Sequence, residues 1–87
     1  MRALSTAVVM VLVAAAPATA SSPAAWDGFR ADVRKACVQR GQELGMKAPQ
    51  VVVHPFGTQS HGIAVLIEGS DKRICVYSKA TKTVELT

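Results

Sequence analysis

Ahead of Pro49, the apolar positions of the chain recur with the spacing of one face of a helix. Ser22 followed by Pro23 is a typical helix start, with a capping side chain and then proline at the first helical position, and Gly45 marks the end. Steps of three, four, four and seven residues separate the apolar members of this face, which are Trp26, Phe29, Val33, Cys37 and Leu44. The pattern predicts one amphipathic helix over residues 22–45.

Beyond Pro49 the pattern changes to short runs of β-branched residues separated by turn residues, which is typical of strands. Four strands are expected, at residues 50–54, 62–68, 73–78 and 83–86. The connectors between them are short enough for hairpins, so the simplest arrangement is an antiparallel meander. The sequence therefore predicts an α+β fold in which one N-terminal helix packs on a four-stranded antiparallel β-meander.

The third predicted strand is apolar on both of its faces. Because side chains alternate with period two, Cys75 and Tyr77 share one face while Ile74 and Val76 share the other. The second strand repeats this, with Ile63, Val65 and Ile67 alternating with Ala64 and Leu66. One helix covers only one face, so we expect an uncovered sheet face that bears Ile74 and Val76. Such patches tend to mark partner sites, unless the helix and connectors shield most of the face or the patch is too small to matter.

The first twenty residues have the three-part pattern of a secretory signal peptide. Arg2 supplies the positive charge, residues 7–16 are apolar, and Ala18-Thr19-Ala20 is a small-x-small cleavage site. The apolar run is half of the ~20 residues that a membrane span needs. We expect residues 1–20 to be a signal peptide and residues 21–87 to form a single small α+β domain, periplasmic or secreted and without membrane association after cleavage.

Cys37 and Cys75 are the only two cysteines, and export would take them to an oxidising compartment in which disulfides persist. Removing 20 of the 87 residues leaves 67, and a chain of that size buries only about 60% of its unfolded surface, so it often needs a covalent link. Cys37 lies on the apolar face of the predicted helix and Cys75 in the middle of the third strand. We expect them to pair and to staple helix to sheet, with free thiols or an intermolecular link as the alternatives.

Charge and residue spacing argue against several classes of function. Without Arg2 the 10 basic residues become 9 against 6 acidic ones, and this net charge of +3 is spread without a long basic run, so no nucleic-acid partner is expected. A thiol nucleophile needs a free cysteine, and no two carboxylates have a spacing that places both in one cleft. A domain of this size has little room for a pocket of ~300 Å³. We therefore expect no enzyme, no catalytic residue and no cofactor.

His54 and His61 are the candidate metal ligands. If the first two strands form a hairpin, the two imidazoles become neighbours, with Cβ atoms ~5 Å apart when directly opposed. Zinc takes three or four protein ligands, and the others would have to come from Glu68, Glu85 or a reduced cysteine. The spacing C-x16-H-x6-H-x13-C matches no compact zinc motif, so we interpret the histidines as the shoulders of a hairpin. A metal-binding periplasmic protein using His54 and His61 is the alternative.

Phe56, in a Pro-Phe-Gly loop, has two interpretations. It folds back over the edge of the sheet, or it stands out as a binding anchor, because aromatic residues are enriched among interface hot spots. With Ile74 and Val76 it makes up the expected partner-binding positions, where the partner is another protein or a second copy of the chain.

The closing segment, YSKATKTVEL at residues 77–86, resembles the last hairpin of PepSY-type domains, small secreted modules of one helix and an antiparallel sheet. That hairpin reads Val-Asp-x-x-Thr-Gly-x-Val, and Thr81 and Val84 match it. The resemblance implies a non-catalytic module associated with secreted peptidases or cell-envelope proteins. The segments RKAC, PFG and ICVY also resemble uncharacterised small secreted proteins of Gram-negative bacteria. We expect a small exported non-catalytic protein that binds a protein partner or itself.

Overall fold

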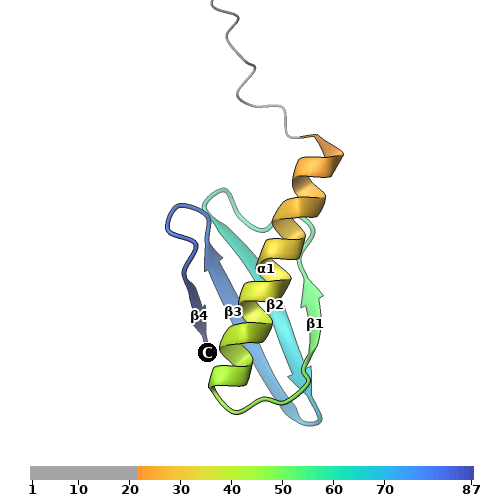
Figure 1. The fold of residues 1–87 in the computed structure, drawn as a ribbon, viewed down its shortest axis with the longest axis vertical. Coiled ribbons are helices and arrows are strands. Elements are labelled where there is room, and N and C mark those ends of the chain that lie inside the picture. The colour runs from red at the N-terminus through yellow and green to blue at the C-terminus, as the bar shows by residue number, and fades with distance from the viewer. Residues whose placement is uncertain (1–21) are drawn as a thin grey trace, which may run out of the picture.

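The computed structural model of the chain describes residues 22–87, in which one helix lies across a four-stranded sheet (Figure 1). Helix α1 spans Pro23–Glu43, and the strands are β1 (Gln50–Val53), β2 (His61–Glu68), β3 (Asp71–Ser78) and β4 (Val84–Leu86). The sheet order is β1-β2-β3-β4, and every neighbouring pair is antiparallel. The predicted α+β fold is confirmed, with strand ends within two residues of those expected. The predicted signal peptide at residues 1–20 lies outside the described residues.

Helix α1 starts as the sequence predicts. The Ser22 hydroxyl accepts a hydrogen bond from the Ala25 N–H at 3.1 Å, and Pro23 occupies the first turn. A capping side chain of this kind satisfies one of the N–H groups that have no partner inside the helix.

At the end of α1, the buried side chain is not the one that the sequence predicts. The helix ends at Glu43, and Gly45 turns the chain away with a φ of 103°, which side chains other than glycine rarely adopt. Leu44, expected on the apolar face, is the C-cap and is 41% exposed, so that expectation is wrong. Met46 is buried instead, and its N–H donates to the Gly41 carbonyl at 2.9 Å. The turn therefore brings an apolar residue from beyond the helix back under it.

The core lies between α1 and the facing side of the sheet. Strand β2 alternates between buried residues that face the helix and half-buried residues that do not. The buried apolar residues come from the helix, from the turn after it and from the two central strands: Val33, Cys37, Met46, Ala64, Leu66, Cys75 and Tyr77. The core therefore lies on one side of the sheet only, and the opposite side of the sheet contributes no residue to it.

The predicted disulfide between Cys37 and Cys75 is confirmed. It joins α1 to β3 across the core, with the two Cα atoms 6.0 Å apart, and both residues are fully buried. The bridge therefore fixes the helix to the sheet at the centre of their contact.

Two glycines allow α1 to approach the sheet closely. A Cβ atom on Gly62 of β2 would lie 2.6 Å from Val33 Cγ2 and 2.9 Å from Phe29 Cζ. A Cβ atom on Gly41 of α1 would lie 3.0 Å from Leu66 Cδ1. Because interiors are close-packed, an added methyl group at either position has to displace a neighbour.

Replacing Gly62 with Ala is expected to lower the free energy of unfolding by about 1–3 kcal/mol, because the methyl group overpacks the contact with Val33 and Phe29. Urea denaturation measures the loss. Gly28→Ala is the control: Gly28 lies in α1 with nothing within 4 Å of an added Cβ, and the substitution is expected to stabilise the protein by about 0.5–1 kcal/mol. Equal stability of both variants would contradict the close approach.

Candidate functional site

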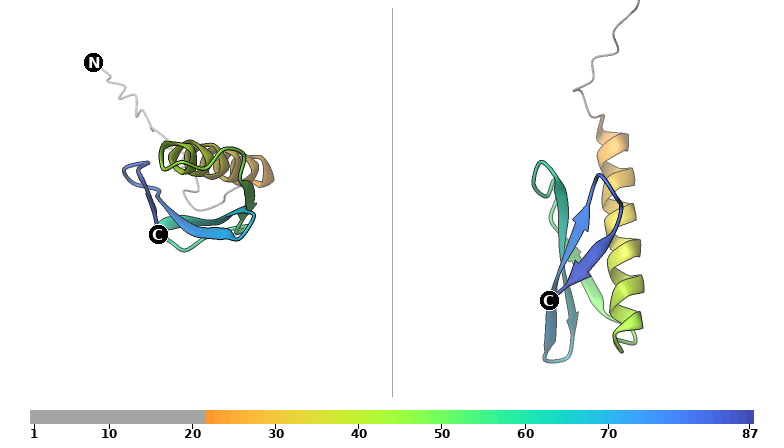
Figure 2. Two further views of the ribbon diagram at one scale, coloured as in Figure 1. Left: turned by 90° about the horizontal axis from the view of Figure 1, so that it is seen from below. Right: turned by 90° about the vertical axis from the view of Figure 1, so that its left-hand side faces the viewer.

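One side of the sheet carries neither a helix nor another strand of residues 22–87. Figure 2 shows α1 on one side of the sheet and the opposite side uncovered. We call this uncovered side the open face. Its residues follow from the strand register, because cross-strand partners share a face.

The open face is apolar at its centre. Val52 pairs with Val65, and Val65 pairs with Ile74, which gives one row across β1, β2 and β3. Ile63 and Val76 pair in the next row. Val52 is 53% exposed and Ile74 is 50% exposed, whereas the other members are half-buried. The aliphatic residues of the face are Val52, Ile63, Val65, Ile67, Ile74 and Val76.

Polar residues frame this apolar centre. In the row of Ile63 and Val76, the N–H of His54 donates to the Ile63 carbonyl at 2.8 Å on the β1 side, and Glu85 pairs with Val76 on the β4 side. In the row of Ile67, the cross-strand partners are Gln50 on β1 and Lys72 on β3. An apolar centre with a polar rim is the usual anatomy of a protein–protein interface.

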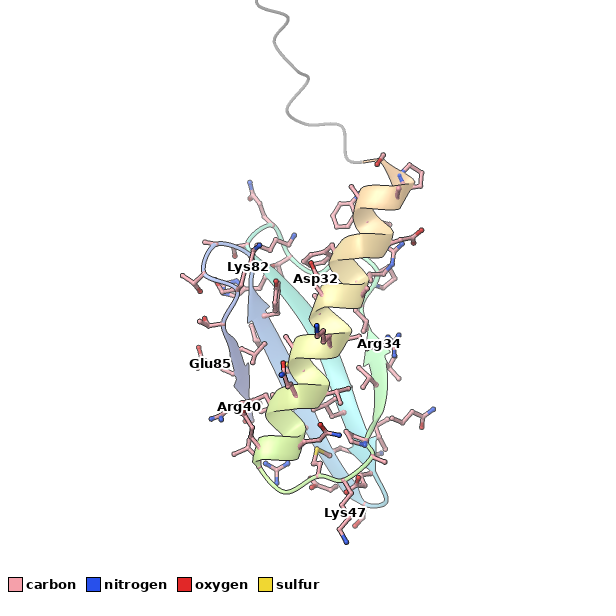
Figure 3. The ribbon with its side chains drawn as sticks, in the orientation of Figure 1. Asp32, Arg34, Arg40, Lys47, Lys82 and Glu85 are labelled. Carbon is pink, nitrogen blue, oxygen red and sulfur yellow. A yellow bond between two sulfur atoms is a disulfide. The ribbon has the colours of Figure 1, made fainter. Side chains whose placement is uncertain are left out.

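The open face is hollowed on its β4 side. The hollow has a volume of about 230 Å³ and is lined by Val76, Glu85, Leu86 and Thr87. A second hollow of about 260 Å³ lies on the helix side, where Figure 3 labels Asp32 and Lys82, and it is completed by Lys35, Ala36, Gln39 and Tyr77. Both fall below the ~300 Å³ at which small-molecule pockets begin.

The β1 edge of the sheet is occupied by arginines from α1. Arg34 Nη1 donates to the Val51 carbonyl at 3.2 Å, and Arg30 Nη1 donates to the Pro55 carbonyl at 2.8 Å. Figure 3 shows Arg34 on the side of α1 that faces β1. Charged side chains at an exposed strand edge hinder pairing with a further strand. The open face, rather than this edge, is therefore the accessible surface of the sheet on the β1 side.

The structure does not bring Phe56 together with Ile74 and Val76. Phe56 is 55% exposed, yet its ring stands edge-on to the ring of Trp26 in the first turns of α1, with centroids 5.0 Å apart. The ring of Trp26 also stands edge-on to the ring of Phe29, with centroids 5.7 Å apart. Such edge-to-face pairs are favourable, so Phe56 folds back against the helix, while Ile74 and Val76 lie on the open face.

The two histidines flank the loop between β1 and β2, as the hairpin interpretation expects, but they are not directly opposed. His54 pairs with Ile63 of β2, whereas His61 pairs with Ser78 of β3. His54 Nδ1 accepts the N–H groups of Phe56 at 3.2 Å and Gly57 at 2.8 Å. His61 Nδ1 is 2.7 Å from the Ser60 hydroxyl. These contacts use one ring nitrogen of each histidine within the loop between β1 and β2.

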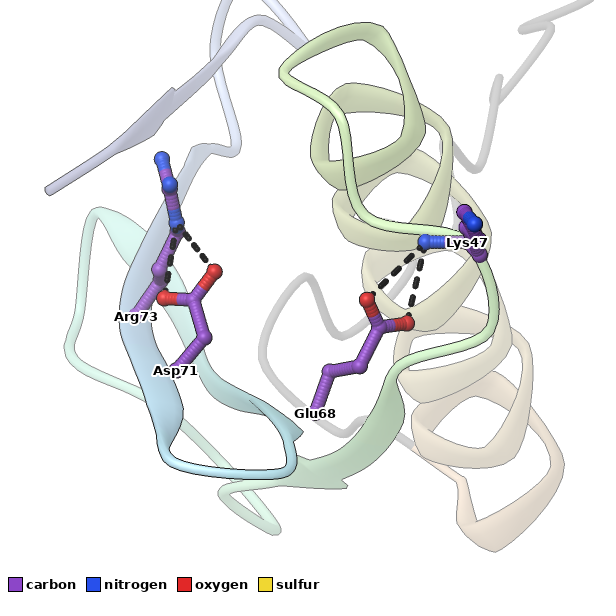
Figure 4. A network of polar contacts seen from close by, with 4 residues as sticks. All are labelled: Lys47, Glu68, Asp71 and Arg73. Atoms are coloured by element: carbon purple, nitrogen blue, oxygen red, sulfur yellow. Dashed lines mark hydrogen bonds and ion pairs between the residues drawn. The ribbon is translucent and has the colours of Figure 1, made fainter.

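Other groups considered as metal ligands are also engaged. Glu68 accepts the N–H of Lys47 at 2.9 Å and of Ala48 at 2.6 Å, which ties the loop after α1 to the end of β2 (Figure 4). Cys37 and Cys75 are in the disulfide. Within residues 22–87 no group of three or more His, Cys, Asp or Glu side chains is placed to hold a metal ion.

Titration of the disulfide-bonded protein with Zn²⁺ is expected to give no saturable heat at micromolar protein concentration, because zinc sites need three or four protein ligands and His54 and His61 supply two from offset positions. Isothermal titration calorimetry measures this. The variants His54→Ala and His61→Ala should give the same trace as the unmodified protein. A micromolar isotherm that either substitution abolishes would instead support the metal-binding alternative.

Sequence reasoning missed Val52 as a member of the open face. Val52 lies in a run of three valines, and alternation alone does not indicate which valine faces outward. The pairing of Val52 with Val65 decides it. The polar rim at His54 and Glu85 was likewise visible only through the register.

Fold and surface together define a small disulfide-bonded α+β domain with one apolar sheet face, and no helix within residues 22–87 is long and apolar enough to span a membrane. Comparison of the chain with protein-family models gives no match, and comparisons with curated proteins and with solved structures give none.

Proposed function

We propose that this chain is a small exported, non-catalytic protein that binds another protein molecule through the open face of its sheet. The observation that carries the proposal is the set of β-branched apolar residues on a face that no other element of the described chain covers. Strand propensity alone does not account for them, because threonine also favours strands and tolerates water. Apolar patches that persist on a surface mark interaction sites.

Two further features support this role. A buried disulfide in a small domain is consistent with an extracytoplasmic, oxidising compartment. The resemblance of residues 77–86 to the closing hairpin of PepSY-type domains supports a non-catalytic role beside secreted peptidases or cell-envelope proteins. The small volume of both surface hollows agrees with protein binding rather than with the enclosure of a small substrate.

Covalent side-chain footprinting in a cell-envelope extract tests the proposal. We expect Ile74 and Val76 to be labelled less in the extract than in dilute buffer, because a bound protein covers the open face. Leu44 is the internal control, since it is 41% exposed at the end of α1 and away from the sheet face. Equal labelling of Ile74 in extract and in buffer, together with no self-association of the purified protein, would rule out an occupied open face.

A further inference from the structure

We propose that the molecule bound at the open face is a second copy of this chain, packed sheet against sheet about a twofold axis that runs parallel to the strands between β2 and β3. This inference rests on the proposed function and adds the identity of the partner. Rotation about such an axis exchanges β1 with β4 and β2 with β3, and each cross-strand row then faces the same row of the second copy.

The apolar centre of the open face is self-complementary under this rotation. The row of Val65 and Ile74 places Val65 opposite Ile74 of the second copy, and the reverse contact forms at the same time. The neighbouring row matches Ile63 with Val76 in the same way. Two of the three aliphatic side chains that β2 contributes to this face therefore meet an aliphatic side chain of β3, and the third, Ile67, meets Lys72.

The polar rim is complementary under the same rotation. His54 and Glu85 lie at opposite ends of one row, which reads His54–Ile63–Val76–Glu85. The twofold axis places His54 of one copy against Glu85 of the other, and this contact occurs twice. Because His54 Nδ1 accepts backbone N–H groups, the proton of the neutral ring lies on Nε2, which is a donor for a carboxylate.

The shape of the face agrees with this arrangement. Val52, the most exposed valine of the sheet at 53%, lies on β1. Its row continues through Val65 and Ile74 to Thr87, which exchanges two backbone hydrogen bonds with Ile74. Rotation therefore places Val52 opposite Thr87 of the second copy, which lines the hollow of about 230 Å³ beside β4. An exposed aliphatic side chain on one half of the face therefore meets a recess on the other half.

The size of the face indicates a reversible dimer. The four strands have 4, 8, 8 and 3 residues, and at ~3.4 Å per residue and ~4.8 Å per strand they cover roughly 375 Å². Two such faces give roughly 750 Å² in total, below the size of stable specific interfaces, which corresponds to weak or transient association.

Other partners fit this surface less well. Its rim carries both signs of charge, with Lys72 on β3 and Glu85 on β4, so it presents no single-sign surface that would select an oppositely charged protein. Pairing of strands at the edges offers less contact, because Arg34 holds the Val51 carbonyl at the β1 edge and β4 has only three residues.

Sedimentation equilibrium of the purified disulfide-bonded protein from micromolar to millimolar concentration tests the proposal. We expect a monomer–dimer equilibrium. Ile74→Glu should raise the dissociation constant at least about 100-fold, because it buries an unpaired carboxylate twice in each dimer. Leu44→Glu, a similar change at an exposed leucine away from the face, should leave the constant unchanged.

A charge exchange tests the twofold geometry itself. His54→Glu and Glu85→Lys are each expected to raise the dissociation constant about tenfold, because each places like or poorly matched groups together. The double variant should return to within about threefold of the original constant, since a new Glu–Lys contact replaces the old one. Within one copy the two positions lie at opposite edges of the sheet, so they couple only across the interface. Additive losses in the double variant would overturn the proposed axis.

The experiments separate this inference from the proposed function. Suppose that the purified protein stays monomeric at millimolar concentration while Ile74 is protected in the envelope extract. The partner is then a different protein, which overturns the proposal of a second copy and leaves the proposed binding face in place. Absence of both self-association and protection would overturn both.

Discussion

Cys75→Ala is expected to lower the free energy of unfolding by about 2–5 kcal/mol, the usual effect of removing a native disulfide from a small domain. The bridge joins residues 38 positions apart, and in the chain-entropy account a loop of that size contributes about 4 kcal/mol. This is a large share of the 5–15 kcal/mol typical of a whole domain. The substitution also trims a fully buried position of β3. Urea denaturation of the variant and of the unmodified protein measures the difference.

The controls for this prediction remove the same disulfide in other ways. Cys37→Ala should cost a similar amount, and the double variant should cost less than the sum of the single variants, because either substitution alone removes the cross-link. Reduction of the unmodified protein should produce a comparable loss. An unchanged melting temperature in Cys75→Ala would show that the bridge does not hold α1 on the sheet.

Leu66→Ala is expected to lower the free energy of unfolding by about 2–5 kcal/mol, the range for truncating a leucine in a close-packed core. Leu66 is fully buried on the helix side of β2, and its Cδ1 reaches the backbone of α1 at Gly41. The helix is held by the disulfide and cannot collapse freely into the space left. The loss therefore includes a cavity contribution as well as the transfer of the side chain to water.

Ile74→Ala is the matched control, because isoleucine and leucine are isomers and the substitution deletes the same number of carbon atoms. Ile74 is 50% exposed on the open face, so its truncation should cost less than about 1 kcal/mol. The comparison is made at concentrations too low for dimer formation, since association adds to apparent stability. Equal losses for Leu66→Ala and Ile74→Ala would contradict the assignment of the open face.

Much of the fold was readable from local pattern. The change from a helical to a strand pattern at Pro49 placed all five elements, and Ser22 with Pro23 marked the helix start. The alternation in β3 separated Cys75 from Ile74 correctly. These features are local, because helix capping and side-chain alternation depend on residues that are neighbours in the chain.

Residues in turns were placed only by tertiary contacts. Met46 is buried because Gly45 turns the chain back beneath the helix, while Leu44, on the predicted apolar face, is left at the surface. Phe56 follows no periodic pattern, and its position is decided by the ring of Trp26, thirty positions earlier in the chain. Contacts of that kind have no local signature.

The sequence by itself determined the helix and the strands, because their apolar residues recur with the period of each element. It also determined the antiparallel meander, because the connectors are short, and the disulfide, because the chain has only two cysteines. The tertiary structure decided the register, and with it the composition of the open face. Register places Val52 beside Val65, moves His61 out of line with His54, and sets His54 and Glu85 at opposite ends of one row. A shift of one residue would turn every side chain of a strand to the other face, so register depends on how the whole helix-side core packs.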